Sequence, residues 1–258
     1  MTEFFDTHAH LDFPDYAEDL EAVVARATAA GITRIVTIGT TLEGSSRAVA
    51  IAERFPSVFA AVGVHPGHVD ESPDEIRPAL RELARHPKVV VIGETGLDYY
   101  RQSGDLTWQH ERFRRHIRAG IAAGKPLIIH TRSAAEDTLR IMREEGAEQV
   151  GGVMHCFTES QDVAQASVEM GFMISFSGIV TFRNAEPLRQ VAKWVPADSL
   201  LVETDAPYLA PVPFRGKRCE PAMVAHTAKV LAGVRGLEIA ALEALTTRNF
   251  ETLFQKAA

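Results

Sequence analysis

Short apolar runs recur roughly every 30 residues along this chain, and they constrain its fold more than any other feature. The runs are rich in β-branched residues, and segments of helical character separate them. Strands that alternate with helices of this length form parallel β-α-β units. Runs that are apolar on both faces, such as VVVIG and PLIIH, indicate strands covered on both sides. The runs are FFDTHAHL, ITRIVTIG, VFAAVGVH, KVVVIGE, KPLIIH, GGVMH, GFMISFSG and SLLVETD.

These units predict an α/β fold, a (β/α)8 TIM barrel followed by C-terminal helices over residues 220–255. A doubly wound open sheet is the alternative, but no GxGxxG motif follows the first run. No linker rich in Pro, Gly or Ser divides the chain, so we expect one domain over residues 1–258. The helical segments between the runs include residues 15–31, 72–86, 105–124, 133–146, 160–171 and 185–195.

Composition excludes several other classes of protein. Hydrophobic residues make up 46% and charged residues 24%, which is enough apolar content for a large core and excludes a disordered chain. The formal net charge is −7, so the surface as a whole is not of the nucleic-acid-binding kind. Any recognition of phosphate must therefore be local.

The sequence also indicates a cytoplasmic protein without a membrane anchor. No apolar run reaches the roughly 18 residues that suggest a membrane span. The opening MTEFFDTHAH has no basic region followed by an apolar one, as a signal peptide would. Cys156 and Cys219 form no CxxC pair, which suits a reducing compartment.

The first run carries polar groups at every second position. Asp6, His8, His10 and Asp12 would share one face of a β-strand, because side chains two apart point the same way. Two imidazoles and two carboxylates on one face need a metal ion or much water. In a barrel, chemistry belongs at the carboxyl ends of the strands, and this run is the first of them.

Similar residues end the other predicted strands. Alone, each of them would as readily be a hydrogen-bonded core residue, a helix cap or an ion-pair partner. Together they would ring the barrel mouth with buried polar groups, which costs several kcal/mol for each unpaired charge. The set therefore predicts metal binding. Besides His8 and His10 it consists of His65, Glu94, His130, His155, Glu203 and Asp205.

The number of candidate ligands favours two adjacent divalent ions rather than one tetrahedral site. Glu94, in the middle of the strand order, is the best candidate for a bridging carboxylate, because the two oxygens of a carboxylate can each take one ion. The mixed nitrogen and oxygen ligands suit Zn, Mn, Co or Fe and do not exclude Mg. Water held between two such ions becomes hydroxide near neutral pH, and Asp205 is placed to accept a proton.

Several motifs resemble, in order and context, those of the TatD-type metal-dependent hydrolases. The resemblance extends over residues 5–250, and its most specific pieces are GETGLD, ETDAPYL and RGKR-x-EP. The other matching motifs are DTHAHLD, GVHP, PLIIHTR and GVMHCF.

The resemblance implies a cytoplasmic (β/α)8 deoxyribonuclease that depends on divalent metals and trims single-stranded DNA from its 3′ end. By motif match, one ion would be held by His8, His10 and Asp205, with Glu94 as the bridge. His130 and His155 would hold the other ion. His65 is similar to a residue near the substrate phosphate, and Glu203 to an additional functional carboxylate. Asp6 and Asp12 then become candidates for holding or capping roles.

Three positions depart from the family pattern and bear on substrate preference. Phe214 and Cys219 stand where relatives often have His and Asn, and Ser133 stands where an acidic residue is common.

Basic and aromatic residues near the predicted mouth bear on the substrate. Arg215, Lys217 and Arg218 follow the last strand, where they could neutralise a phosphodiester. Tyr99 and Tyr100 could stack on an unpaired base or pack against the helices. A further basic group is better explained as a solvated helix face, and it consists of Arg112, Arg114, Arg115 and Arg118.

Two other functions remain open. The same metals could serve a deacylase, such as one acting on D-aminoacyl-tRNA, or a small-molecule esterase or amidase. A metal-binding partner protein without catalysis is the third hypothesis, although an open mouth argues against a purely structural site. The sequence shows no feature that requires an obligate protein partner.

Overall fold

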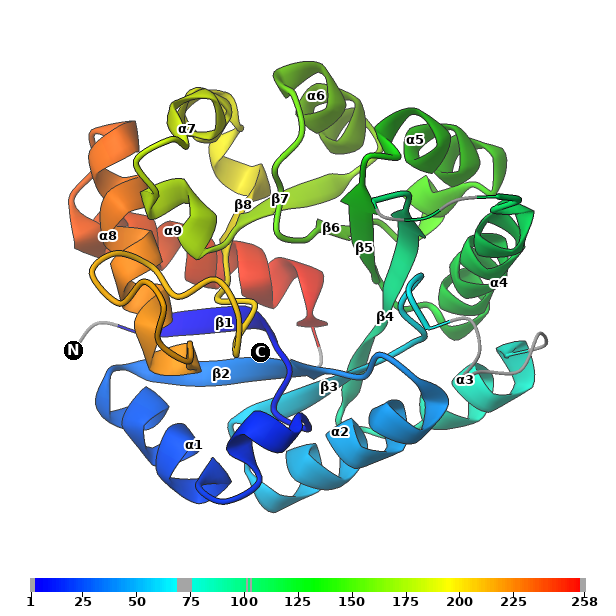
Figure 1. Cartoon of the computed structure of the whole chain (residues 1–258), viewed down its shortest axis with the longest axis horizontal. Helices are drawn as coiled ribbons and strands as arrows, with labels where there is room; N and C mark the ends of the chain where they lie inside the picture. Colours follow the sequence, from blue (N-terminus) through cyan, green and yellow to red (C-terminus); the bar gives the residue numbers. More distant parts are fainter. Residues whose placement is uncertain (1–2, 69–75, 101, 103, 256–258) are drawn as a thin grey trace.

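The computed structural model describes residues 3–68, 76–100, 102 and 104–255 of the chain. Its strands lie side by side in chain order, from β1 to β8, and every neighbouring pair is parallel (Figure 1). The strands are β1 (Phe4–Ala9), β2 (Ile32–Ile38), β3 (Val58–Val62), β4 (Val89–Asp98), β5 (Leu127–Arg132), β6 (Gly152–Met154), β7 (Phe172–Phe176) and β8 (Leu200–Val202).

Helices surround this sheet on its outer face (Figure 1). Each predicted strand is present, and the predicted helices are present with shifted ends. The predicted helix over residues 72–86 is shorter, and residues 72–75 lie outside the described part of the chain. The helices are α1 (Leu20–Ala29), α2 (Leu42–Arg54), α3 (Arg77–Leu83), α4 (Thr107–Ala123), α5 (Ala135–Glu144), α6 (Gln161–Glu169), α7 (Glu186–Trp194), α8 (Val224–Arg235) and α9 (Ile239–Leu253).

Local sequence explains where several helices begin and end. Thr41 caps α2 by accepting a hydrogen bond from the Gly44 N–H at 2.8 Å. Ser160 caps α6 in the same way, through the N–H of Val163. Gly124 ends α4 in the left-handed conformation, with φ 60°, which a residue without a Cβ adopts readily.

The sheet nearly closes into a barrel between its first and last strands. Ala9 at the end of β1 pairs in parallel with Ala206, just after β8. The N–H of His10 donates to the Ala206 carbonyl at 2.7 Å, and the N–H of Asp205 donates to the His8 carbonyl at 2.9 Å. The structure therefore confirms the (β/α)8 barrel.

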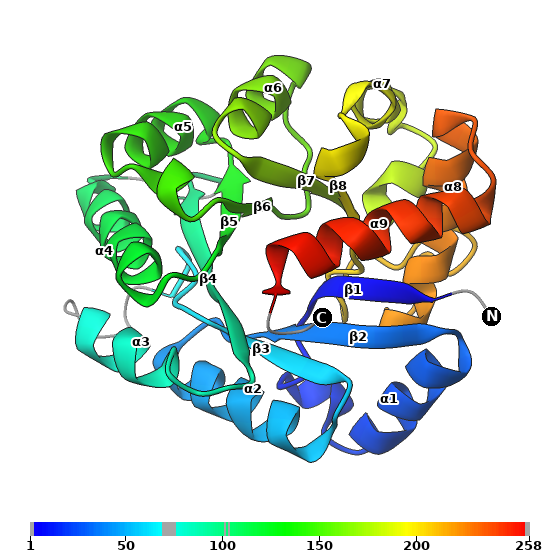
Figure 2. The ribbon, with the colours of Figure 1, turned by 180° about the vertical axis from the view of Figure 1, so that it is seen from behind.

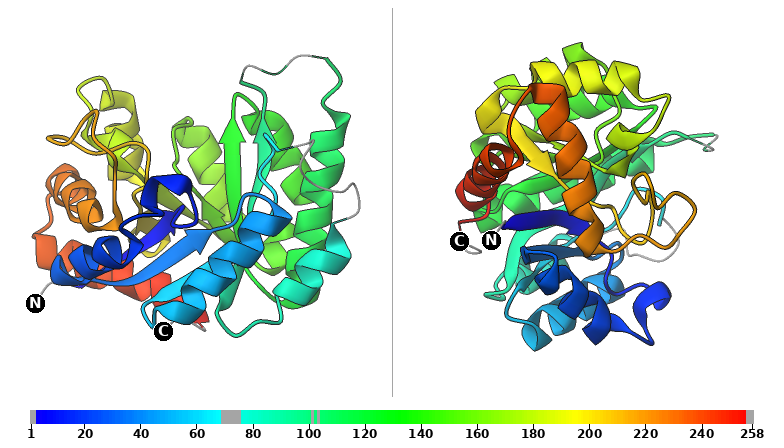
Figure 3. Two further views of the ribbon diagram at one scale, coloured as in Figure 1. Left: turned by 60° about the horizontal axis from the view of Figure 1, so that its bottom comes forward. Right: turned by 90° about the vertical axis from the view of Figure 1, so that its left-hand side faces the viewer.

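The chain buries two apolar clusters, one on each face of the sheet. The larger cluster lies between the strands and the surrounding helices. The smaller one fills the barrel and includes Val36, Ile128 and Leu201, together with Phe250 of α9 and Phe254 just after that helix. Seen from behind, α9 runs across this end of the barrel (Figure 2). The segment 206–223 projects on the opposite side, so the two ends of the barrel are built differently (Figure 3).

None of the helices in the described ranges combines the length and the apolarity needed to cross a bilayer.

Candidate metal centre

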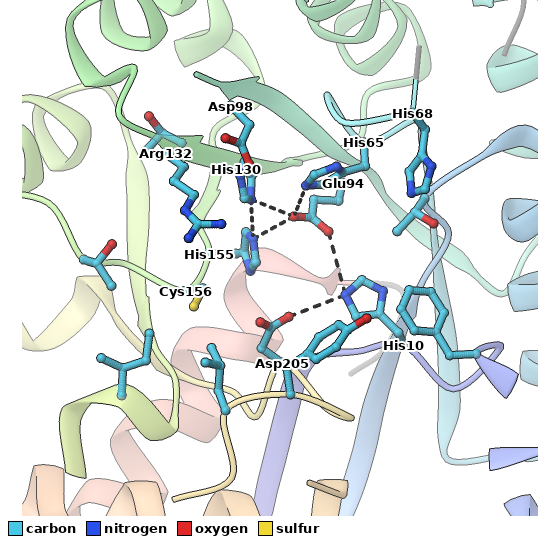
Figure 4. A pocket seen from close by; sticks show the side chains of 17 residues that line it. His10, His65, His68, Glu94, Asp98, His130, Arg132, His155, Cys156 and Asp205 are labelled. Atoms are coloured by element: carbon cyan, nitrogen blue, oxygen red, sulfur yellow. Dashed lines mark hydrogen bonds and ion pairs between the residues drawn. The ribbon is translucent and has the colours of Figure 1, made fainter. Parts of the chain in front are cut away.

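The carboxyl ends of five strands bring the predicted ligands together. His8 lies in β1 and His10 directly after it, Glu94 lies in β4, and His130 lies in β5. His155 follows β6, and Asp205 follows β8. Four of these side chains line a cavity of about 620 Å³ together with Asp205 (Figure 4). His8 is fully buried, and its Nε2 lies 3.3 Å from His10 Nε2. Glu94 and His130 are inside their strands rather than at the ends, because β4 and β5 extend farther than predicted.

Glu94 stands between two groups of histidines. Its Oε2 lies 3.4 Å from His8 Nε2 and 3.9 Å from His10 Nε2. Its Oε1 lies 2.8 Å from His155 Nε2 and 3.0 Å from His130 Nδ1. Each carboxylate oxygen thus faces its own pair of imidazole nitrogens.

The two histidine pairs are arranged as ligands of a cation would be. The Nε2 atoms of His8 and His10 lie 3.3 Å apart, and so do His130 Nδ1 and His155 Nε2. Nitrogens about 2.1 Å from one ion at a tetrahedral angle lie about 3.4 Å apart. Because at most one nitrogen of each facing pair can donate to the other, a cation satisfies both lone pairs better than a hydrogen bond does. The residues present therefore fit a metal.

Asp205 completes the cluster from the segment after β8. Its Oδ1 lies 3.4 Å from His10 Nε2 and 3.6 Å from His8 Nε2. With His8 and His155 it forms a further group whose ligand atoms lie within 4.8 Å of one another. Asp205 has φ 58°, so the chain leaves the extended conformation just before its side chain enters the site.

Burial and charge oppose each other in this cluster. Glu94 is only 2% exposed, and burial alone would raise its pKa. The surrounding histidines, His155 first, nevertheless hold the pKa of Glu94 well below its ordinary value. Burial likewise opposes protonation of His155, yet Glu94 and Glu203 raise its pKa. The site therefore keeps the Glu94 carboxylate ionised.

Asp98 fixes the orientation of His130 from outside the cluster. Its Oδ2 lies 3.2 Å from His130 Nε2, the ring nitrogen that points away from Glu94. Its Oδ1 accepts from the Tyr100 N–H at 2.9 Å. The side-chain amide of Gln109 binds both the N–H and the carbonyl of Asp98, each at 2.9 Å. A carboxylate on the outer nitrogen is the usual support of a ligating histidine.

Glu203 performs the same task for His155. Its Oε1 lies 3.3 Å from His155 Nδ1 and accepts from the Cys156 N–H at 2.6 Å. β8 ends at Val202, so the strand does not continue far enough for Glu203 and Asp205 to share a face. Glu203 is fully buried behind His155 and does not line the cavity, whereas Asp205 does.

Asp6 and Asp12 hold neighbouring segments instead of facing the cavity. Asp6 accepts hydrogen bonds from the N–H of Thr204 at 2.9 Å and from its hydroxyl at 2.6 Å. Burial raises the pKa of Asp6 to about 7 despite these bonds. Asp12 pairs with Arg47 at 3.2 Å. Asp6 thereby anchors the segment that carries Glu203 and Asp205.

His65 lies at the edge of the same cluster. Its Nε2 is 3.5 Å from Glu94 Oε1, and its Nδ1 accepts from the Gly67 N–H at 2.9 Å. Burial lowers the pKa of His65 to about 3, so this ring is neutral at physiological pH. The preceding Val64 N–H donates to His116 Nε2 at 2.9 Å, which ties this segment to α4.

The basic loop after β8, which was predicted to contact phosphate, uses its arginines for contacts within the protein. Arg218 forms two bonds to Asp19, at 2.9 and 2.8 Å, so its guanidinium is already paired in this structure. The Arg215 guanidinium stacks 3.5 Å from the centre of the Phe182 ring. Neither Arg215, Lys217 nor Arg218 lines the cavity.

The basic helix face is solvated only in part, because Arg118 is exposed whereas Arg114 and Arg115 are half-buried. Arg114 binds Glu144 and Glu145, and Arg118 binds Glu145. These partners come from the end of α5, so the two arginines join neighbouring helices. Arg112 is buried, stacks on Trp108 and donates to the His68 carbonyl, and is thus a packing residue.

One cation that the sequence did not single out does line the cavity. Arg132 follows the HT of the HTR motif and points toward His130 and His155 (Figure 4). Its guanidinium carbon lies 3.8 Å from the centre of the Tyr100 ring. The sequence held one signal for Arg132. It is the last residue of PLIIHTR, two positions beyond His130, and β5 continues as far as Arg132.

The remaining predicted residues lie away from the cavity. Tyr99 bonds His110 at 2.5 Å and Asp137 at 2.8 Å through its hydroxyl, so it packs against the helices. Cys219 is buried, and its carbonyl accepts from the Tyr16 hydroxyl. The positions that depart from the family pattern, Ser133, Phe214 and Cys219, are absent from the cavity wall.

Known proteins resemble this chain along nearly its whole length. A family model described as TatD related DNase matches residues 5–255. The uncharacterized metal-dependent hydrolase YcfH of Escherichia coli (strain K12) is 46% identical over 252 residues, which cover 96% of this chain and 94% of that protein. The 3′-5′ ssDNA/RNA exonuclease TatD of Enterobacter lignolyticus is 36% identical over 255 residues, with 97% and 98% covered.

A solved structure agrees with these sequence relatives. The crystal structure of YJJV, a TatD homolog from Escherichia coli K12, superposes with a TM-score of 0.91 at 31% identity, and 98% of each chain is covered. The barrel, the histidine and carboxylate cluster and the relatives lead to one assignment. The chain belongs to the TatD family of metal-dependent hydrolases.

Proposed function

We propose that this protein is a two-metal phosphodiesterase that degrades DNA, acting on single strands from the 3′ end. The proposal rests on the position of Glu94, because its two carboxylate oxygens face two separate histidine pairs. A carboxylate that contacts two ions at once is typical of paired-metal hydrolases. The relative from Enterobacter lignolyticus, named as a 3′-5′ ssDNA/RNA exonuclease, supports nucleic acid as the substrate.

In this proposal His8, His10 and Asp205 would hold one ion, His130 and His155 would hold the other, and Glu94 would be a ligand to both. When bound, the ions polarise a phosphoryl oxygen and lower the pKa of water, and Mg, Mn, Zn or Co could serve. The two free thiols, Cys156 and Cys219, are compatible with a reducing cytoplasm as the place of action.

The remaining side chains move the proton and hold the ligands. Burial opposes ionisation of Asp205, but His10 and its neighbours keep the pKa of this carboxyl below its ordinary value. Asp205 is therefore ionised at neutral pH and can accept the proton of the attacking water. Neutral His65 contributes a ring at the cavity wall for the phosphate. Glu203 acts through His155 as a positioning residue.

The test loads the protein with Mg, Mn, Co or Zn and supplies 3′- or 5′-labelled single- and double-stranded DNA, D-aminoacyl-tRNA and an aryl ester. We expect loss of mononucleotides from the 3′ end of single strands. In Glu94→Gln we expect a fall in kcat of at least about 10³-fold and a bound-metal count reduced from two per chain. Glu159→Gln, a carboxylate nearby that is outside the cluster, should retain both.

Each competing function has its own outcome. Intact DNA with a cleaved acyl bond would replace the nuclease by a deacylase. No cleavage of any substrate with two metals bound would favour a non-catalytic binding protein. Fewer than one metal per chain at saturation would contradict the shared premise of all three.

A further inference from the structure

Arg132 is a cation on the cavity wall whose charge no carboxylate neutralises among the residues that the structure describes. Its side chain is exposed and lies over the Tyr100 ring, with the guanidinium carbon 3.8 Å from the ring centre. By contrast, Arg114, Arg118 and Arg218 each form close ion pairs with glutamate or aspartate. In a chain of net charge −7, such an arginine beside the metal cluster stands out.

Stacking on Tyr100 prepares Arg132 for an anion. A guanidinium that lies over a ring keeps its N–H donors in its own plane, free to form a bidentate pair with a phosphate. Figure 4 shows the guanidinium directed into the cavity, on the side of His130 and His155. Because Tyr100 also uses its backbone N–H to bind Asp98, this support is tied to the carboxylate that orients His130.

The wall contributed by the segments after β1 and β8 is aromatic. The ring of Phe13 stacks on His10, with centroids 4.6 Å apart and planes inclined by 19°. Tyr208 meets Phe13 nearly edge-on at 6.2 Å and is 53% exposed, one of the most exposed large aromatic side chains in the described residues. Both rings line the same cavity as Arg132. β5 lies opposite β1 in the barrel order, so the cationic and aromatic walls face each other across the cluster of histidines and carboxylates.

We propose that these walls form a subsite for one unpaired nucleotide: Arg132 binds a phosphate beside the scissile one, and Tyr208 with Phe13 stacks on its base. This inference rests on the proposed nuclease function and deepens it. A base inside a duplex has both faces covered by its neighbours, so only an unstacked base can offer a face to Tyr208. A cavity of about 620 Å³ also has the size that accommodates one small ligand rather than a DNA duplex.

The test separates the two walls by their chemistry. Arg132→Gln should make the dependence of log kcat/KM on log salt less steep by about 0.7, the value for one lost contact to a single strand. Arg143→Gln is the matched control, because Arg143 lies on the exposed outer face of α5. Tyr208→Ala should lower kcat/KM by about 10- to 100-fold, and Tyr208→Phe should retain most of it.

An abasic 3′-terminal nucleotide identifies the base contact. On that substrate wild type and Tyr208→Ala should become equal, while the effect of Arg132→Gln should persist. A Tyr208→Ala defect that survives on the abasic substrate, or an unchanged salt dependence in Arg132→Gln, would overturn the subsite.

A binding assay keeps this result distinct from failure of the nuclease proposal. Anisotropy is measured with the metal-loaded protein and a labelled single strand whose 3′-terminal linkages are phosphorothioates. If the strand binds with the same dependence on Arg132 and Tyr208 but no DNA is cleaved, the subsite stands and the nuclease proposal is wrong. If DNA is cleaved and no variant changes binding or rate, only the subsite is wrong. If nothing binds, both are wrong.

Discussion

Both ends of this barrel bury side chains completely, but the chemistry of those side chains is opposite. At the end covered by α9, Phe250 is fully buried and packs its ring 4.5 Å from Phe5 and 4.7 Å from Phe254. At the other end, Glu94 and His8 are just as deeply buried. Burial alone therefore does not distinguish a core from a site. The difference is that apolar rings satisfy one another, whereas facing imidazole nitrogens require a cation.

The charged groups at the amino ends of the strands differ from those at the carboxyl ends, because they bind backbone carbonyls. Lys88 Nζ donates to the carbonyls of Phe55, Pro56 and Val58 at 3.0 to 3.2 Å. Lys125 is buried and donates to the carbonyl of Val89. These ammonium groups bind backbone and lie away from the metal cluster. They stabilise the amino end, and the carboxyl end is left for chemistry, as is usual in barrels.

The largest expected effect breaks the apolar end. Phe250→Ala should lower the free energy of unfolding by about 3–5 kcal/mol, since it removes a buried ring from between Phe5 and Phe254. Urea unfolding of the metal-free protein measures it. Metal content and the apparent metal affinity of the folded protein should stay unchanged. Altered metal stoichiometry would show that the two ends are not independent.

A smaller loss of stability should come from His116 at the polar end of the barrel, and only at acidic pH. Burial lowers the pKa of His116 to about 4 from an unfolded value of 6.5, so the unfolded chain binds more protons between these values. Its contribution is complete above pH 6.5 and is lost as the pH falls to 4, about 3 kcal/mol in all. The Nε2 atom of the neutral ring accepts a hydrogen bond from the Val64 N–H, and its Nδ1 atom lies 2.8 Å from the Arg112 carbonyl oxygen.

The measurement is urea unfolding between pH 4 and 7.5 in the presence of a chelator. His116→Gln should flatten the pH dependence by that amount, because the other histidines titrate alike in both proteins. Phe250→Ala should leave the pH dependence as in wild type. Parallel curves for wild type and His116→Gln would contradict the assignment.

The smallest effect compares two arginines at the same end. Arg218→Gln should leave KM for DNA and its salt dependence within about twofold of wild type, because this guanidinium is already bound to Asp19. Steady-state kinetics on labelled single strands at several salt concentrations provide the readout, with Arg132→Gln assayed beside it. A weaker salt dependence in Arg218→Gln would mean that the loop releases Asp19 to meet the substrate.

The sequence by itself determined the barrel and the positions of the predicted ligands. Apolar runs at a regular spacing predict parallel strands, and parallel strands of a barrel deliver their ends to one place. His8, His10, Glu94, His130 and Asp205 could therefore be grouped although up to 197 positions separate them. This inference needs only the spacing of the strands and the chemistry of the side chains.

Only the tertiary structure decided which polar residue faces the cavity and which supports it from behind. The left-handed turn at Asp205 separates it from Glu203, and the extension of β5 carries Arg132 into the mouth. Arg218, which the sequence placed near a phosphate, is paired in the structure with Asp19, 199 positions away. The opening stretch DTHAHLD shows the same division, since its two histidines enter the cluster and its two aspartates hold neighbouring segments. A side chain's role depends on the partner that reaches it, and those partners come from segments that only folding brings together.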